Sequence, residues 1–435
     1  MPSNAVADVV GLLGQQRILD PGPLEEVKAF QARFADARAL FKELINRGWM
    51  SGYQATQILS GRAAGLTLGS YVILDLLGEG GAGQVFKAKH VSMNRLVALK
   101  VLRKDLVSDQ EVVARFYREI EVASHISHPN IVHAYDAGPI GSALVLAMEF
   151  VDGLNLEQLV KENGKLPVGH ACDYIRQAAV GLQHAHEKGL IHRDIKPSNL
   201  LLVTKAHGAQ AVGVVKILDL GLARLAHPAT TSATKNLTVL AGNAVMQGTP
   251  DYMAPEQAVD FHTADTRADI YSLGCTFFYL LAGAPPFTGS LPEKLMKHQT
   301  VPPPAIEDIR KDVPPAIAEV LKKMLAKRPP DRYRVPGEVA QALAPFVPAR
   351  RKSGLKPGDP QAGSSDKMAA VRAPSGTFKT PAGPRHSTVD IPGKGSGKLA
   401  AYQKSKRRRL VVMTLFGTVV LVGLFALFVS LLSSN

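Results

Sequence analysis

The chain has 435 residues, of which 46% are hydrophobic and 20% are charged, and this composition excludes a collagen-like or wholly disordered protein. Its length allows two or three domains of roughly 100 to 200 residues each. The net charge of +14 is concentrated in residues 349–409, where 15 Lys and Arg stand against 3 Asp, a net +12 that leaves +2 for the rest. A nearly neutral folded part argues against a nucleic-acid-binding protein.

Two cysteines, Cys172 and Cys275, are too few for a disulfide framework or a Cys-rich zinc site. We interpret both as small apolar residues on buried helix faces, which fits a reducing compartment. The N-terminus also lacks the basic and apolar segments that are typical of a cleaved signal peptide. Together these observations favour a chain whose folded part stays inside the cell.

Residues 1–66 are predicted to form a small helical module. Apolar residues recur at helical spacing in residues 6–18, 27–34, 39–45 and 53–59. We expect Pro21-Gly22-Pro23, Gly48 and Gly61 to separate these helices. Trp49 is interpreted as a packing residue. No catalytic pattern is present, so we interpret the module as a helical adaptor of unknown role.

A glycine-rich run follows, within a pattern of short strands over residues 71–102. Gly78, Gly80 and Gly83 have the G-x-G-x-x-G spacing, and Val85 comes shortly after them. Glycines allow backbone N–H groups to approach phosphate oxygens, which a Cβ atom would obstruct. A dinucleotide site has the same spacing but needs a helix directly after the glycines. Here a strand pattern continues, which favours a flap over ATP.

A lysine, Lys100, lies inside the apolar strand pattern of residues 97–102. A buried ammonium group is costly unless its charge is paired. We predict that Glu119, in the next helical stretch, pairs with Lys100 and holds it on the α and β phosphates of a nucleotide. The alternative is a lysine at a strand end with an exposed tip.

The most specific motif extends from His192 to Asn199. Within it, Asp194 can accept the hydroxyl proton of a substrate, and Lys196 can steady a transferring phosphoryl group. Asn199 can bind one magnesium ion. His192 alone would suggest a general base or a metal ligand, but beside Arg193 and Asp194 we interpret it as a structural residue that fixes the loop.

A further apolar strand pattern ends at Asp219, which lies 20 residues after Asn199. Magnesium prefers oxygen ligands and keeps several waters, so one Asp, one Asn and the phosphates are sufficient. An isolated Asp near a glycine usually marks only a turn. The spacing of 20 residues from Asn199 favours the interpretation of Asp219 as a metal ligand over that of a turn residue.

In combination these motifs resemble those of the eukaryotic-like (Hanks-type) Ser/Thr protein kinases, in the membrane-anchored bacterial branch. The resemblance covers residues 71–347. It implies an α+β, bilobal fold, with a small lobe of five strands and one helix, a larger helical lobe, and ATP between them. It also implies transfer of the ATP γ-phosphoryl group to Ser or Thr of protein substrates, with Mg²⁺, or Mn²⁺ as an alternative.

The resemblance also assigns roles to single residues. Met148 is the implied gatekeeper, and Glu149 and Val151 are implied hinge residues that face the adenine. Asp194 is the implied base with Lys196 beside it, and Asn199 and Asp219 are the implied metal ligands. The implied nucleotide-binding residues are Gly78, Gly80, Gly83, Val85, Ala98, Lys100, Glu119, Met148, Glu149 and Val151.

Downstream residues agree with the same family. Asp269 resembles its buried helix aspartate, and Arg332 is expected to pair with Glu256. Lys196 together with Thr249 indicates Ser/Thr specificity. The chain departs from the family at Leu220, where phenylalanine is usual, and in two extended segments, residues 206–210 and 223–247. None of these departures removes a reacting group, which implies an active enzyme.

Arg193 precedes the implied base, and in kinases with this arginine a phosphate commonly orders the activation segment. We predict autophosphorylation within residues 230–238, with Thr238 favoured, and a dimer for transfer in trans. The alternative is an exposed Ser/Thr-rich loop that is merely soluble.

Residues 348–409 are rich in Pro, Gly and Ser, and are predicted to form a flexible linker. Residues 410–432 then carry no charge, and as a helix they would span about 34 Å against a hydrocarbon core of about 30 Å. Five basic residues within 404–409 predict a single-pass cell-membrane protein with a cytoplasmic kinase part and residues 433–435 outside. We expect these basic residues to attract anionic lipid. A buried core helix is the alternative.

A membrane-tethered scaffold that uses a kinase fold only for binding is the main alternative function. In that case residues 1–66 would recruit partners. The presence of Lys100, Asp194, Asn199 and Asp219 argues against this alternative, because a scaffold has no need of them.

Overall fold

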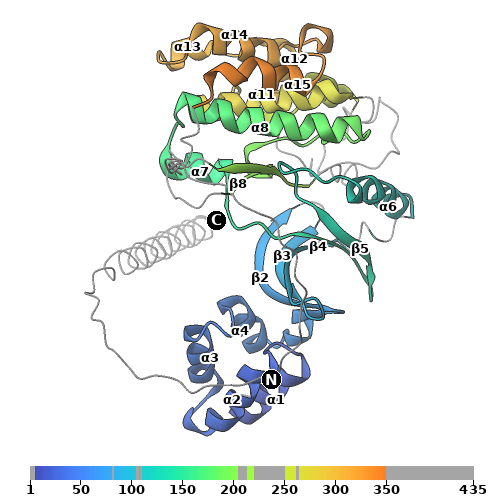
Figure 1. The fold of residues 1–435 in the computed structure, drawn as a ribbon, viewed down its shortest axis with the longest axis vertical. Helices are drawn as coiled ribbons and strands as arrows, with labels where there is room; N and C mark the ends of the chain where they lie inside the picture. The colour runs from blue at the N-terminus through green and yellow to red at the C-terminus, as the bar shows by residue number, and fades with distance from the viewer. Residues whose placement is uncertain are drawn as a thin grey trace, which may run out of the picture. The chain divides into compact units, whose positions relative to one another are not determined.

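The structure is a computed structural model that describes residues 5–80, 83–103, 107, 110–203, 213–219, 250–260 and 264–348. All of these belong to one compact unit. Helices of the N-terminal module, a β-sheet and a helical lobe follow one another along the long axis of Figure 1.

The N-terminal module consists of four short helices, as the apolar spacing predicted. They are α1 (Val6–Gln15), α2 (Pro21–Phe30), α3 (Ala37–Asn46) and α4 (Gly52–Leu59), with 3₁₀ turns at Gln31–Arg33 and Ala63–Leu66. Pro21-Gly22-Pro23 lies at the boundary between α1 and α2, as expected, and forms the first turn of α2. Proline suits the first helical position, where its missing N–H would have no partner within the helix.

A six-stranded antiparallel sheet follows, in the order β1-β2-β3-β4-β6-β5. Its strands are β1 (Thr67–Leu68), β2 (Tyr71–Gly80), β3 (Gly83–His90), β4 (Arg95–Leu102), β5 (Ala134–Ile140) and β6 (Ala143–Glu149). The family resemblance implied five strands. The sixth, β1, pairs only with Tyr71 and Val72, so β2 is an edge strand beyond that point.

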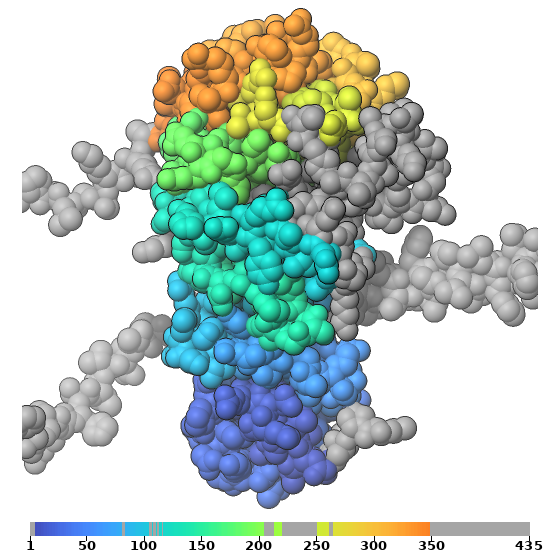
Figure 2. All heavy atoms as spheres, turned by 90° about the vertical axis from the view of Figure 1, so that its right-hand side faces the viewer, coloured from blue at the N-terminus to red at the C-terminus, as the bar shows by residue number. Residues whose placement is uncertain are grey.

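The two faces of this sheet are covered by different helices. Leu102 on β4 and Leu144 on β6 pack with Phe116 of α6 (Gln110–Ser124). The alternate residues Val97, Leu99, Val145 and Ala147 instead join an apolar cluster with the helices of the N-terminal module. Because successive side chains of a strand point to opposite faces, the module lies on the face away from α6. Figure 2 shows the module, in dark blue, directly against the lighter blue strands.

The larger lobe is helical and encloses a separate apolar core built mainly around α8 and α11. Its helices are α7 (Leu156–Asn163), α8 (Val168–Glu187), α10 (Pro255–Val259), α11 (Thr266–Ala282), α12 (Leu291–Thr300), α13 (Ile306–Ile309), α14 (Pro315–Met324) and α15 (Pro336–Leu343). A small sheet of β7 (Leu154–Asn155), β8 (Leu200–Val203) and β9 (Val214–Ile217) lies where the two lobes meet.

Both cysteines are buried in this core, as expected. Burial raises the pKa of Cys172 to about 12, which keeps its side chain a neutral thiol at physiological pH. The lobe ends in a 3₁₀ turn, Ala344–Phe346, and Pro348 is its last described residue.

The predicted membrane segment, residues 410–432, lies outside the described residues, as does the linker from residue 349 onward. Within the described part of the chain, no helix combines the length and the apolar composition that a bilayer span requires.

Candidate active site

The catalytic-loop motif follows α8 and is held by a buried carboxylate of α11. Asp269 accepts hydrogen bonds from the backbone N–H groups of His192 (2.8 Å) and Arg193 (2.7 Å). Arg193 has a φ of 64°, a left-handed conformation that is costly for a non-glycine residue, and these hydrogen bonds stabilise it. Burial acts to raise the pKa of Asp269, but the His186 imidazole at 2.8 Å helps to lower it below its usual value. The expected buried helix aspartate is therefore present.

His192 connects the catalytic loop to the segment that carries Asp219. Its Nδ1 accepts a hydrogen bond from the backbone N–H of Asp194 (3.2 Å), so Nε2 can donate to the Leu218 carbonyl at 2.7 Å. The residue is 1% exposed. Both ring nitrogens are thus used inside the protein, which agrees with the structural interpretation of His192.

Asp194, Lys196 and Asn199 lie together within one loop and one 3₁₀ turn, Pro197–Asn199. The Nζ of Lys196 is 2.8 Å from Oδ2 of Asp194. The Nδ2 of Asn199 donates to the backbone carbonyl of Asp194 (2.8 Å) and to its Oδ2 (3.1 Å). The Asp194 side chain is still 34% exposed, so a substrate hydroxyl could reach it.

An ion pair joins the two lobes near this loop. The Nζ of Lys100, on β4, lies 2.9 Å from Oδ1 of Asp219, and the Lys100 side chain is only 7% exposed. Burial acts to raise the pKa of Asp219, but the Lys100 charge and hydrogen bond, with His192 and Lys196, lower it below its usual value. Asp219 is therefore a carboxylate at neutral pH, and it neutralises a buried ammonium group.

The predicted partner of Lys100 was Glu119. Glu119 lies on α6 and is partly buried. The ion pair that the structure gives Lys100 is with Asp219, so the pairing of Lys100 with Glu119 stays a prediction.

The two predicted metal ligands fit a magnesium ion. The Leu218 N–H, directly before Asp219, donates to the backbone carbonyl of Asn199 (2.9 Å), so the two segments adjoin. Asp219 contributes an ionised carboxylate and Asn199 an amide oxygen, which are the hard donors that magnesium prefers.

The glycine-rich run is aligned with Lys100 across three strands. Gly78 is opposite Val85 in the β2–β3 pair, and Val85 is opposite Lys100 in the β3–β4 pair. Gly83 pairs with Gly80 and has a φ of 150°. A Cβ atom at Gly83 would lie 2.0 Å from the Val101 carbonyl oxygen, so only glycine fits there.

The implied adenine-binding residues Ala98 and Met148 lie in the same sheet as Gly78, Val85 and Lys100. Ala98 is opposite Met148 in the β4–β6 pair, and both are buried. Val151 follows β6 and is partly buried.

The contacts of Glu149 limit its predicted role at the hinge. Its carboxylate accepts a hydrogen bond from Lys216 (2.9 Å), and its backbone N–H donates to the His133 carbonyl (2.9 Å). The backbone N–H and Oε2 of Glu149 are thus already used inside the protein. Sequence reasoning missed Lys216, because a lysine in a short strand gives no sign of a distant partner.

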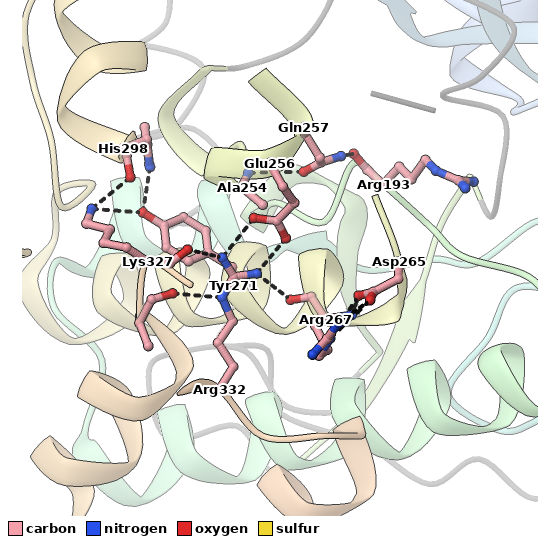
Figure 3. Close-up of polar contacts among 11 residues, drawn as sticks. Arg193, Ala254, Glu256, Gln257, Asp265, Arg267, Tyr271, His298, Lys327 and Arg332 are labelled. Atoms are coloured by element: carbon pink, nitrogen blue, oxygen red, sulfur yellow. Dashed lines mark hydrogen bonds and ion pairs between the residues drawn. The ribbon is translucent and has the colours of Figure 1, made fainter. Parts of the chain in front are cut away.

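In the helical lobe, Arg332 pairs with Glu256 as predicted (Figure 3). Its Nη1 lies 2.6 Å from Oε1 of Glu256, and its Nη2 lies 2.8 Å from Oε2. The guanidinium also donates to the backbone carbonyls of Ala326, Arg267 and Lys327, and its side chain is fully buried. All five guanidinium N–H groups therefore have acceptors.

Gln257, next to Glu256, was also missed by the sequence analysis. Its Nε2 donates to the Arg193 carbonyl at 2.9 Å (Figure 3). This contact connects α10 to the catalytic loop.

Replacement of Arg332 by alanine should lower the free energy of unfolding by about 3 to 5 kcal/mol, because it leaves the partly buried Glu256 carboxylate without its fully buried ion-pair partner. Arg334→Ala is the matched control, since Arg334 is 87% exposed and pairs with Glu338 at the surface. It should cost less than about 1 kcal/mol. Urea unfolding followed by circular dichroism measures both, and equal shifts would contradict the structural role of Arg332.

Comparisons with known proteins agree with this geometry. Residues 71–343 match the protein kinase domain family. The chain is 34% identical over 349 residues to serine/threonine-protein kinase PknA of Mycobacterium tuberculosis, covering 79% of this chain and 73% of PknA. It is 36% identical over 282 residues to PknB of the same species, covering 63% of this chain but only 42% of PknB.

A solved structure, the PknI kinase domain of Mycobacterium tuberculosis, superimposes with a TM-score of 0.50 at 30% identity, covering 66% of this chain and 99% of that domain. The family match spans more than half of the chain. The chain therefore belongs to the protein kinase family and is a bacterial Hanks-type serine/threonine protein kinase.

Proposed function

We propose that this kinase transfers the γ-phosphoryl group of ATP to Ser or Thr hydroxyls of protein substrates, on the cytoplasmic side of a membrane and under control of autophosphorylation. The proposal of phosphoryl transfer is supported mainly by one observation. The Lys100–Asp219 ion pair adjoins the loop that holds Asp194, Lys196 and Asn199. A complete set of positioning and charge-stabilising groups is what phosphoryl transfer requires.

In the proposed reaction the substrate oxygen forms a bond to the γ-phosphorus as the bond to the β–γ bridging oxygen breaks. The hydroxyl proton passes to the carboxylate of Asp194, and ADP leaves. Lys196, 2.8 Å from Asp194, offsets negative charge on the transferring group. A magnesium ion held by Asn199 and Asp219 would neutralise phosphate charge. Lys100 would hold the α and β phosphates.

The first test is transfer of radiolabelled phosphate from ATP to a generic protein substrate. Lys100→Met and Asp219→Ala should each reduce transfer by at least about a hundredfold, because each removes a charge that positions or neutralises phosphate. Lys89→Met is a matched control in a neighbouring strand, since Lys89 pairs with Asp20 of the N-terminal module. It should keep near wild-type activity. No transfer by the wild type with Mg²⁺ or Mn²⁺ would favour the scaffold alternative.

The proposed control site lies in residues 230–238, outside the described residues. It is supported by Arg193, directly before Asp194, since a phosphate on the activation segment can pair with such an arginine. Transfer between two copies of the chain would deliver this phosphate.

Mass spectrometry of the purified protein should find phosphate within residues 230–238, with Thr238 favoured, and none in an Asp194→Asn variant. The variant lacks the base, so it cannot modify itself. The same phosphosites on both proteins would show that another kinase places them, and would refute autophosphorylation.

The proposed membrane location is supported by the uncharged residues 410–432 and the basic residues within 404–409. An apolar segment of this length can span a bilayer, and each nearby Lys or Arg adds about 1 kcal/mol of attraction to anionic lipid.

The full-length protein reconstituted with vesicles should stay bound in high salt, since an apolar span does not depend on charge. A variant with Gln at Lys404, Lys406, Arg407, Arg408 and Arg409 should keep this binding but lose its preference for anionic lipid. Release of the wild type by salt would contradict the span. Wild-type binding that ignores lipid charge would contradict the role of the basic run.

A further inference from the structure

Ser51, the N-cap residue of α4, and Gln54 within α4 contact strand β2 from the N-terminal module. Gln54 is 1% exposed and lies in an interface that buries mainly apolar side chains. Its Nε2 donates to the Ile73 carbonyl at 2.8 Å, and its Oε1 accepts from the Ser51 N–H at 3.0 Å. The Ser51 hydroxyl donates to the Leu74 carbonyl and accepts from the Gln54 N–H. We refer to these four hydrogen bonds as the Ser51–Gln54 clamp.

The clamp acts where β2 is least supported by other strands. On its outer side β2 pairs with β1 only at Tyr71 and Val72, so the following residues lie on an open edge. The register to β3 also shifts between Ile73 and Asp75, which leaves Leu74 outside the ladder. Such a bulge bends a strand and needs other partners for its backbone. Ser51 and Gln54 supply those partners at two consecutive carbonyls.

The strand then leads directly into the glycine-rich run. Gly78 follows Leu74 by four residues and is opposite Val85, which in turn is opposite Lys100. A second register shift lies between Leu76 and Gly78. The direction of β2 after the bulge therefore determines where Gly78 and Gly80 lie relative to Lys100.

The same helix also contacts the returning strand. The rings of Tyr53 on α4 and Phe86 on β3 have centroids 6.3 Å apart. Phe86 directly follows Val85, and successive strand residues point to opposite faces. Helix α4 thus supports both strands of the nucleotide flap from the face opposite to Lys100.

We propose that Ser51 and Gln54 are positioning residues for nucleotide binding, and that the N-terminal module acts through them on the glycine-rich run. They touch neither the nucleotide nor the reacting atoms. Without the clamp, the residues of β2 after the bulge would occupy several positions. The glycine-rich run would then be in its nucleotide-binding position in only a fraction of the molecules. The apparent affinity for ATP falls in proportion to that fraction. This inference rests on the proposed function only in the kinetic test, because KM and kcat can be measured only if the protein transfers phosphate.

The test uses the full-length protein and compares the KM for ATP with kcat. Gln54→Ala and Ser51→Ala should each raise the KM for ATP about five- to tenfold, as expected for loss of buried hydrogen bonds, and change kcat less than about twofold. Ser51→Thr keeps a hydroxyl and should restore the wild-type KM. Gln57→Ala is the matched control, because Gln57 is on the same helix but accepts from Arg62 within the module.

A second readout is the equilibrium binding of a fluorescent ATP analogue, which needs no phosphoryl transfer. The dissociation constant should rise by the same factor as the KM in Gln54→Ala. If the wild type binds the analogue but transfers no phosphate, the proposed function is wrong, but the binding measurement still tests the role of the clamp. If Gln54→Ala lowers the melting temperature but leaves both KM and binding unchanged, the clamp is only structural and the proposal is wrong. An equal effect of Gln57→Ala, or no nucleotide binding by the wild type, would also overturn it.

Discussion

The ion pair between Lys100 and Asp219 is the interaction on which the rest of the site depends. It connects β4 of the small lobe to the segment after β9 at 2.9 Å. Lys100 needs this partner, since its side chain is 7% exposed and a buried ammonium group is costly when its charge is unpaired, whereas the Asp219 side chain is 32% exposed. The ion pair therefore places a cation and an anion side by side where the small lobe meets the helical lobe.

A chain of hydrogen bonds extends from this ion pair into the helical lobe. Asp219 follows Leu218, whose carbonyl contacts His192, and the backbone of His192 is held by Asp269 of α11. Asp269 also fixes the left-handed conformation of Arg193. The catalytic loop and the segment that carries Asp219 are thus both held in place through one buried carboxylate of α11.

The small lobe depends on a different support. Its sheet is covered by α6 on one face and by the N-terminal module on the other, and both faces bury apolar side chains. Residues 5–66 therefore form part of the structure that carries the glycine-rich run, in addition to any role as an adaptor. The buried hydrogen bond from Gln54 fixes the position of α4 along β2, because a hydrogen bond has a required geometry and apolar packing does not.

Sequence reasoning identified groups with local signatures better than it identified their partners. The catalytic loop could be predicted from its motif, and Asp269 and the Arg332–Glu256 pair from the resemblance to the kinase family. The contact between Lys100 and Asp219 joins residues 119 positions apart, and no local pattern indicates it.

The N-terminal module shows the same limit. Its apolar spacing predicted four helices that bury one face, but a helical period does not reveal what that face packs against. Ser51 and Gln54 form an ordinary capping box in the sequence, and only the fold shows that the same side chains also hold β2. The start of α2 at Pro21 was missed because proline can either separate helices or begin one.

The most direct test of the account is a double-mutant cycle on the free energy of unfolding, measured by urea unfolding of the protein without nucleotide. If Lys100 and Asp219 form one ion pair, the loss in the double variant of Lys100→Met and Asp219→Ala should be smaller than the sum of the two single losses by at least about 0.5 kcal/mol. Losses that add, as for independent residues, would contradict the dependence of the site on this ion pair.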